Sequence, residues 1–189
     1  MNILEHRALP GPNPYSPYPT ILMRLDLGEL AERSSRQIKG FTERLLSAMP
    51  TLREHRCSED RPGGLVVRLE EGTYLGHVVE HVAIELQCLA GIRVGFGKTR
   101  QTSTPGVYQV VYRYREEKSG LEAGRLAVEL VEACARGEEL DVDRAVDILE
   151  EDYGVPVVTN PIAPVWRLIS LGVAPPVEGW GRLLANRRG

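Results

Sequence analysis

Residues 76–85 read GHVVEHVAIE, a stretch in which apolar residues separate two histidines and two glutamates. In a helix, residues four apart lie one above the other, so His77 and His81 can aim their imidazoles at one point. Glu80, three residues after His77, lies on the same side. This is the H-x-x-E-H spacing of the inverted zincin metallopeptidases. The stretch therefore predicts a helix that binds a zinc ion and supports metal-assisted hydrolysis.

A zinc ion, or another divalent metal, on two imidazoles needs one more protein ligand and keeps a position for a water molecule, which Glu80 would deprotonate. Glu85 lies a further turn along the helix, about 6 Å away, so we expect it to orient His81 rather than bind the metal. The alternative is a pair of structural histidines. Because the intervening residues are apolar, the helix is expected to be buried, and buried histidines need partners or a metal.

The third ligand must come from another part of the chain. Glu116 and Glu117, between a predicted strand and a predicted helix, are the best-placed carboxylates. The competitors on the later helices are Glu122, Glu129, Glu132, Glu150 and Glu151. Each of these also has an ordinary explanation as a solvated helix carboxylate. His55 is expected to line the site or bind substrate, or else to be a loop histidine, and position alone does not make Cys57 a nucleophile.

The rest of the pattern mixes short strands with helices. Strands are expected at 3–9, 21–27, 65–69, 107–114 and 155–158, and helices at 41–48, 73–90, 117–136, 141–153 and 165–171. Thr73 is the expected N-cap of the motif helix. This order favours an α+β fold, with a mostly antiparallel sheet and helices packed on one face. We expect one domain at 1–137 and a C-terminal helical extension at 138–189 packed on it.

Composition restricts the class of protein. The 189 residues carry a net charge of −3, which argues against a nucleic-acid partner. The 3 cysteines are far apart and odd in number, so they indicate a reducing compartment rather than a disulfide framework. No apolar run approaches the roughly 20 residues of a membrane span, and the first residues lack a signal-peptide pattern. A cytoplasmic protein is expected.

One further motif imitates a phosphate-binding loop, because Gly97-Lys98-Thr99 matches the end of that signature. The signature requires a preceding strand and a shorter spacing than the one from Gly91 to Gly97, and here a helix precedes. A glycine-rich turn beside a strand is therefore the expected structure.

Six blocks of sequence, in order, resemble the N-terminal domain of cyanophycin synthetase. The blocks are 2–4 with 7–9 and 11–13; 23–27; 54–58 with 63–64; 71–73 with 76–87; 95–100; and 106–108. The family's full-length enzyme joins aspartate and arginine into a branched polymer through an ATP-grasp domain and a ligase domain, and neither lies within these residues. The resemblance implies that the N-terminal domain holds the polymer. In some members it resembles pitrilysin-type metallopeptidases and cuts the polymer into primers.

The resemblance also implies roles for individual residues. It matches His77 and His81 to the histidines and Glu80 to the acid of the hydrolytic motif, and it places the third metal ligand at Glu117. Arg100 and Arg125 become candidates to hold substrate carboxylates.

Three functions remain open at the level of sequence. The first is a zinc-dependent, pitrilysin-like hydrolase that cleaves an Asp/Arg polymer or a related charged peptide. The second is a non-catalytic module that binds such a polymer or a partner ligase. The third is an accessory subunit of separately encoded ligase domains.

Overall fold

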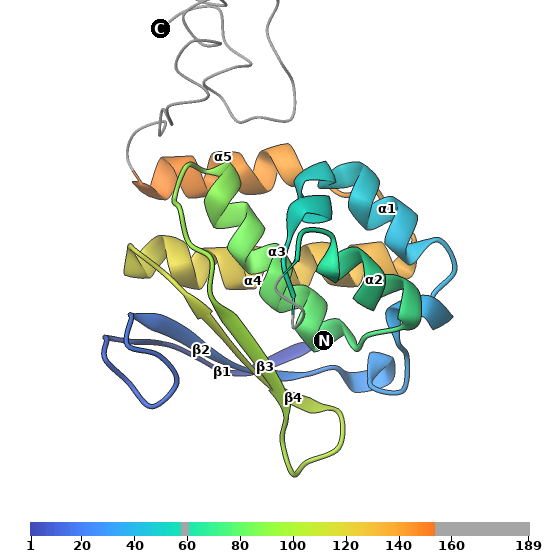
Figure 1. Cartoon of the computed structure of the whole chain (residues 1–189), viewed down its shortest axis with the longest axis horizontal. Helices are drawn as coiled ribbons and strands as arrows, with labels where there is room; N and C mark the ends of the chain where they lie inside the picture. Colours follow the sequence, from blue (N-terminus) through green and yellow to red (C-terminus); the bar gives the residue numbers. More distant parts are fainter. Residues whose placement is uncertain (58–60, 154–189) are drawn as a thin grey trace, which may run out of the picture.

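The computed structural model describes residues 1–57 and 61–153. Within them it contains a four-stranded antiparallel sheet of order β1-β2-β4-β3, with helices on one face of the sheet (Figure 1). The strands are β1 (Asn2–Leu9), β2 (Thr20–Asp26), β3 (Gly97–Gln101) and β4 (Val107–Arg113), and the helices are α1 (Phe41–Ala48), α2 (Gly64–Glu71), α3 (Leu75–Leu89), α4 (Glu117–Arg136) and α5 (Val142–Tyr153). The predicted α+β class, with helices on one face of an antiparallel sheet, is confirmed.

The inner face of the sheet is apolar because alternate residues of the central strands point toward the helices. Met23 of β2 and Tyr112 of β4 are both 0% exposed. The Tyr112 hydroxyl donates to the carbonyl of Gly120 at 3.0 Å, and a Cβ on Gly124 would lie only 2.7 Å from Met23 Cε. Two glycines thus let α4 lie directly on the central strands.

Helix α3, which contains the motif, lies at the centre of the molecule. It packs against α4, α5 and strands β3 and β4. Every residue from Leu75 to Gln87 except His77 is buried. The N-cap is Tyr74 rather than Thr73, because the Thr73 side chain contacts His77 instead.

Two of the expected elements differ from the structure. Residues 65–69 form most of helix α2 rather than a strand. Gly63, at φ +81°, precedes the helix, and Leu65 and Leu69, four residues apart, are both 0% exposed. The β-branched pair at 66–67 favours a strand locally, but the spacing of the two leucines buries one helical face, and that burial decides the structure.

The second difference is β3, which was expected as a glycine-rich turn. Residues 97–101 pair with β4 from Tyr112 to Tyr108 and form an edge of the sheet. Glycine, lysine and arginine give this segment little strand propensity of its own, so pairing with β4 creates the strand.

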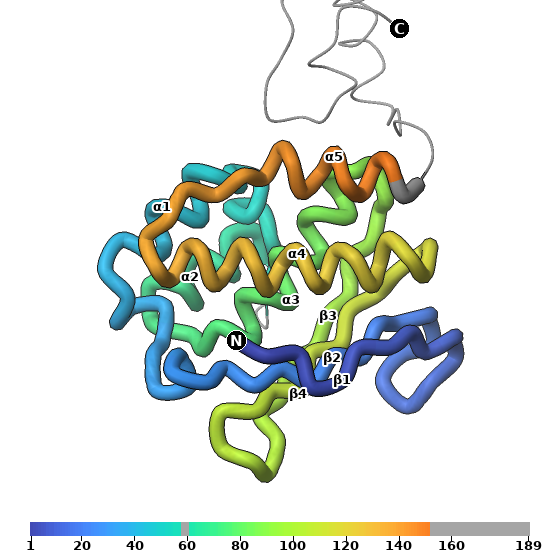
Figure 2. Tube along the Cα trace, turned by 180° about the vertical axis from the view of Figure 1, so that it is seen from behind, coloured from blue at the N-terminus to red at the C-terminus, as the bar shows by residue number. Residues whose placement is uncertain are grey.

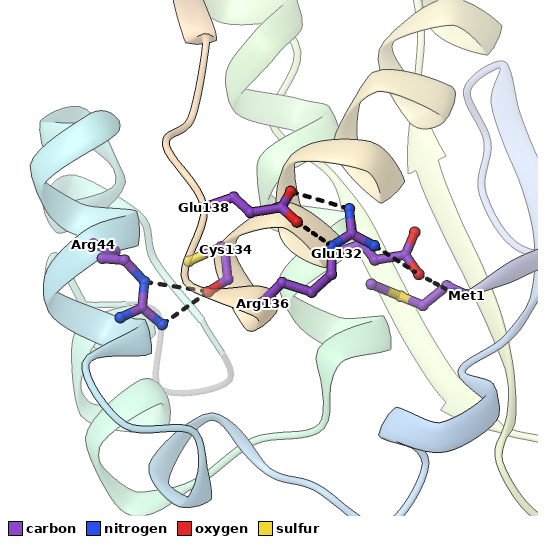
Figure 3. A network of polar contacts seen from close by, with 6 residues as sticks. All are labelled: Met1, Arg44, Glu132, Cys134, Arg136 and Glu138. Atoms are coloured by element: carbon purple, nitrogen blue, oxygen red, sulfur yellow. Dashed lines mark hydrogen bonds and ion pairs between the residues drawn. The ribbon is translucent and has the colours of Figure 1, made fainter.

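The C-terminal end of α4 is held by a network of polar contacts (Figure 3). Arg44 of α1 donates to the carbonyl of Cys134 through Nη2 at 2.9 Å and through Nε at 3.2 Å. Arg136 pairs with Glu132 at 3.6 Å and with Glu138 at 2.7 Å, and Glu132 also accepts from the amino group of Met1 at 2.6 Å. Cationic side chains are favourable here because the last carbonyls of a helix carry partial negative charge.

Helix α5 covers α4 on the side opposite the sheet, as both views of the molecule show (Figures 1 and 2). Val146 and Leu149 of α5 belong to the same apolar core as the rest of the chain. The expected boundary at 137/138 stays a prediction, and the strand at 155–158 and the helix at 165–171 lie outside the described residues. Among those that are described, no helix combines the length and apolarity needed to cross a membrane.

Candidate functional site

A cavity of about 600 Å³ opens between α3, the segment 54–57 and the segment 94–99 that leads into β3. His77, Glu80 and His81 line it from α3, and His55 and Cys57 line it from the facing segment. The motif residues therefore lie in a hollow rather than sealed inside the core.

Three side chains in this cavity could hold a metal ion: Cys57, His77 and His81. Their ligand atoms all lie within 4.8 Å of one another. Nε2 of His77 is 3.1 Å from Nε2 of His81 and 3.4 Å from the Cys57 sulfur. We refer to these three residues as the Cys-His-His cluster.

The far side of His81 is held by a chain of hydrogen bonds. Glu85 accepts from the Thr51 hydroxyl, and its other oxygen lies 2.5 Å from His55 Nε2. Nδ1 of His55 lies 3.0 Å from Nδ1 of His81. Glu85 therefore acts on His81 through His55, one residue further away than the sequence suggested.

These contacts assign the protons of His81. If His55 donates Nε2–H to Glu85, its Nδ1 is an acceptor and accepts a hydrogen bond from Nδ1–H of His81. The Nε2 lone pair of His81 then faces His77. The Thr73 hydroxyl lies 3.0 Å from Nδ1 of His77, and a hydroxyl can donate to that nitrogen or accept from it. If Thr73 accepts, the Nε2 lone pairs of the two histidines face each other, and a cation between them stabilises that arrangement.

Burial keeps both motif histidines neutral. It lowers the pKa of His77 to about 4, with a smaller contribution from the charge of Arg68. Burial also lowers the pKa of His81 well below 6.5, and the neighbouring His77 and His55 lower it further. Neutral imidazoles are the form that binds metals, so the environment favours the ligand state.

Glu80 lies beside the Cys-His-His cluster but is not part of it. Its carboxylate accepts a hydrogen bond from the Thr99 hydroxyl of β3 at 2.6 Å, and its side chain lies where a Cβ on Gly97 would be. Burial raises the pKa of Glu80 to about 7, although the bond from Thr99 opposes this shift. In this arrangement Glu80 joins α3 to the edge strand.

The other predicted site residues lie elsewhere. Glu117 is exposed at the start of α4, and the structure does not bring it to the two histidines. Arg100 is exposed on β3. Arg125 pairs with Glu122 and Glu129 on its own helix, and these carboxylates raise its pKa.

Sequence reasoning missed the contributions of Cys57 and Thr73. Cys57 is separated from α3 by helix α2, and only its position two residues after His55 connects it with the site. Thr73 was predicted to cap the helix, because a threonine just before a helix is a typical N-cap. Its position in sequence does not distinguish that role from its contact with His77.

Comparison with known proteins places this chain in a family. A family model described as cyanophycin synthase-like N-terminal domain matches residues 22–136. Cyanophycin synthetase of Synechocystis sp. (strain ATCC 27184 / PCC 6803 / Kazusa) is 54% identical over 132 residues, which cover 69% of this chain and 15% of the relative. Cyanophycin synthetase of Trichormus variabilis (strain ATCC 29413 / PCC 7937) is 46% identical over 175 residues, covering 91% of this chain and 18% of the relative. The chain thus spans less than a fifth of the curated relatives it matches.

These relatives correct the function that the H-x-x-E-H spacing predicted. They are synthetases, which join their substrates, so the expected zinc-dependent hydrolase is wrong. The chain belongs to the family of cyanophycin synthase-like N-terminal domains.

Proposed function

We propose that this domain is a non-catalytic module that holds an Asp/Arg polymer while ligase domains act on it. The family match supports a role at the polymer. The observation that carries the proposal is the cavity of about 600 Å³, because its walls combine both signs of charge with apolar side chains. Its volume is within the ordinary range for a ligand site, roughly 300–1,000 Å³.

The lining matches a polymer with both acidic and basic groups. Arg56 and Lys98 are exposed bases at the cavity and suit carboxylates, while Glu54 suits a guanidinium. Val94 and Phe96 add apolar surface. A polymer segment could therefore bind with its charged groups against the cavity walls, and this binding does not require cleavage of the polymer.

The test is direct binding. The chain is mixed with soluble Asp/Arg polymer, binding is measured by calorimetry, and the polymer is then sized by mass spectrometry. We expect saturable binding and an unchanged length distribution. Arg56→Glu should weaken binding about tenfold, because it turns attraction into repulsion at the cavity wall.

Arg53→Glu is the matched control, since Arg53 is also exposed and lies three residues earlier but does not line the cavity. Its affinity should stay close to that of the unmodified chain. Absence of binding, or equal losses in both variants, would refute the proposal.

A second candidate function, metal binding, is supported by the Cys-His-His cluster. A thiolate and two imidazoles are ligands typical of zinc. We propose that Cys57, His77 and His81 hold a zinc ion, which would supply a fixed positive charge and fasten residues 55–57 to α3. A pitrilysin-like fold fits histidines on a buried helix and stays a prediction.

Metal analysis of protein purified without a histidine tag tests this second function. We expect about one zinc per chain, with loss of zinc in Cys57→Ala. Cys88→Ala is the control, because Cys88 is also half-buried at the cavity but its thiol donates to the Val94 carbonyl at 3.3 Å. Zinc retained by Cys57→Ala, or never bound by the unmodified chain, rules the site out.

A further inference from the structure

The 3 cysteines of the chain have different surroundings. Cys134 is 0% exposed, and its thiol donates to the Phe41 carbonyl at 3.5 Å. Cys88 is half-buried at the cavity, where its thiol donates to the Val94 carbonyl at 3.3 Å. Burial raises the pKa of both thiols, that of Cys134 to about 11. Both sulfurs are therefore kept in the protonated form, which reacts slowly with oxidants.

Cys57 differs from the other two cysteines. It is half-buried and lines the cavity of about 600 Å³, so its sulfur can be reached from solvent. Its neighbour is a ring nitrogen, Nε2 of His77 at 3.4 Å, rather than a backbone carbonyl. A cysteine that binds a metal is deprotonated, and the thiolate is the nucleophilic form of the residue. Cys57 thus combines access from the cavity with thiolate character in the metal-bound chain.

The Cys-His-His cluster depends on this one sulfur. Within the described residues three side chains form the cluster, and two of them, His77 and His81, lie one turn apart on α3. Zinc sites in proteins typically use three or four protein ligands. Without the thiolate only two imidazoles remain, and one of the contacts between segment 54–57 and α3 is lost. A change confined to the Cys57 sulfur therefore acts on the metal site and on the cavity wall together.

We propose that Cys57 is a modification site for hydrogen peroxide, and that its oxidation to a sulfenic acid releases the metal from the Cys-His-His cluster. This inference rests on the second proposed function, zinc binding, and adds a redox control to it. Hydrogen peroxide has only two oxygen atoms, so the cavity is wide enough to admit it.

The oxidation balances with peroxide as the oxidant. The Cys57 thiolate attacks one oxygen of the peroxide, an S–O bond forms, and the O–O bond breaks. Sulfur loses two electrons, and the second oxygen leaves as hydroxide. The sulfenic acid is neutral and is a poorer metal ligand than the thiolate. A low-molecular-weight thiol reverses the change: one molecule displaces water to form a mixed disulfide, and a second frees the Cys57 thiol as the two small thiols join.

The oxidation is expected to stop before an internal disulfide forms. Cys88 is three helical turns beyond His77 on α3, about 16 Å along the helix axis. The Cα atoms of a disulfide lie within about 7 Å of each other. Cys134 is buried in the apolar core. Among the three cysteines, all of which the structure describes, neither of the others therefore lies beside Cys57.

The experiment follows oxidation and metal release in one sample of the zinc-loaded chain. Hydrogen peroxide is added with dimedone, which labels sulfenic acids, and mass spectrometry of peptides locates the label. A chromogenic chelator records free zinc over the same period. We expect Cys57 to be labelled about tenfold faster than Cys88 or Cys134, and zinc to appear at the rate of Cys57 labelling. An excess of a small thiol, added to a sample oxidised without dimedone, should restore zinc binding.

Two variants separate the Cys57 sulfur from its surroundings. Cys57→Asp replaces the thiolate with a carboxylate, which zinc accepts and peroxide does not oxidise, so this variant should hold its zinc in peroxide. Cys88→Ala should lose zinc at the same rate as the unmodified chain. Because the labelling is measured on the unmodified chain, the test does not depend on the folding of either variant.

Equal labelling of the three cysteines, a disulfide between Cys57 and Cys88, or zinc that stays bound while Cys57 is labelled would overturn the inference. Zinc lost from Cys57→Asp as fast as from the unmodified chain would also overturn it. In each of these results zinc is bound before peroxide is added, so zinc binding stands and only its redox control fails. A chain that never binds zinc refutes the second proposed function itself, and this inference with it.

Discussion

At the scale of single residues, hydrogen bonds outside the Cys-His-His cluster decide which imidazole nitrogens face its centre. Thr73 contacts Nδ1 of His77 at 3.0 Å and thereby directs Nε2 toward Cys57 and His81. Such orienting partners commonly contribute tenfold or more to metal affinity. The side chain of Thr73 is therefore part of the proposed metal site although it holds no metal.

Thr73→Val should weaken zinc binding about tenfold, because valine fills the same space but cannot hydrogen-bond to His77. Competition with a chromogenic chelator measures the affinity. Thr42→Val, a change of the same kind on α1, should leave it unchanged. A Thr73→Val protein that binds zinc as tightly as its parent would show that packing alone orients His77.

Gly97 is a second residue whose identity matters. A Cβ there would collide with the Glu80 carboxylate, whereas a Cβ on Gly95 would have nothing within 4 Å. Gly97→Ala should lower the free energy of unfolding by about 1–3 kcal/mol, since Glu80 or β3 must move. Chemical denaturation of Gly95→Ala gives the control, for which no loss is expected. Equal stability of the two variants would contradict the described position of Glu80.

At the scale of elements, helix α4 has a well-defined start. Glu116 is its N-cap and accepts from the backbone N–H groups of Lys118 at 3.0 Å and Ser119 at 2.5 Å. Burial is the largest single influence and raises the pKa of Glu116, but the bonds from Ser119 and Lys118 and the charge of Lys118 together outweigh it and hold the pKa below 4.5. The cap therefore stabilises the fold in its ionised form.

Glu116→Ala should lower the free energy of unfolding by about 1 kcal/mol at neutral pH. Because the folded-state pKa is depressed, the contribution is complete above 4.5 and disappears as the pH falls below that value. Glu117→Ala, one residue later and exposed, should have a much smaller effect. Denaturation curves at neutral and acidic pH distinguish the two, and a gap between them that persisted in acid would refute the cap.

The elements also show what sequence can predict here. Helices 41–48 and 117–136 were predicted with their observed bounds, because each has a clear apolar face and a clear end. Strand β3 and helix α2 were not, since pairing with β4 and burial of two leucines are tertiary effects. In the site, the four-residue spacing of His77 and His81 predicted that their side chains lie together. Cys57 is 20 residues before His77, with α2 between them in sequence, so its contact with His77 depends on tertiary packing.

At the scale of the whole molecule, α5 and the sheet belong to one core. Leu149 is 0% exposed and belongs to the same apolar cluster as residues of β2 and β4. Removing it should therefore weaken the entire described structure rather than α5 alone.

Leu149→Ala should lower the free energy of unfolding by about 2–5 kcal/mol while unfolding stays a single transition. Circular dichroism and tyrosine fluorescence, followed together during denaturation, test this. Arg144→Ala, exposed on the same helix, should cost much less. Two separate transitions would show instead that α5 folds as its own unit.

The burial of α3 on nearly every side has a consequence for exchange of its amide hydrogens with solvent. Because the helix is exposed only where it lines the cavity and at its C-terminal end, its central amides should exchange only when the whole chain unfolds. Its slowest amides then report the global free energy of unfolding directly. A metal or polymer segment that binds only the folded chain would slow all of them by one common factor, and that factor would give its affinity without any label on the site.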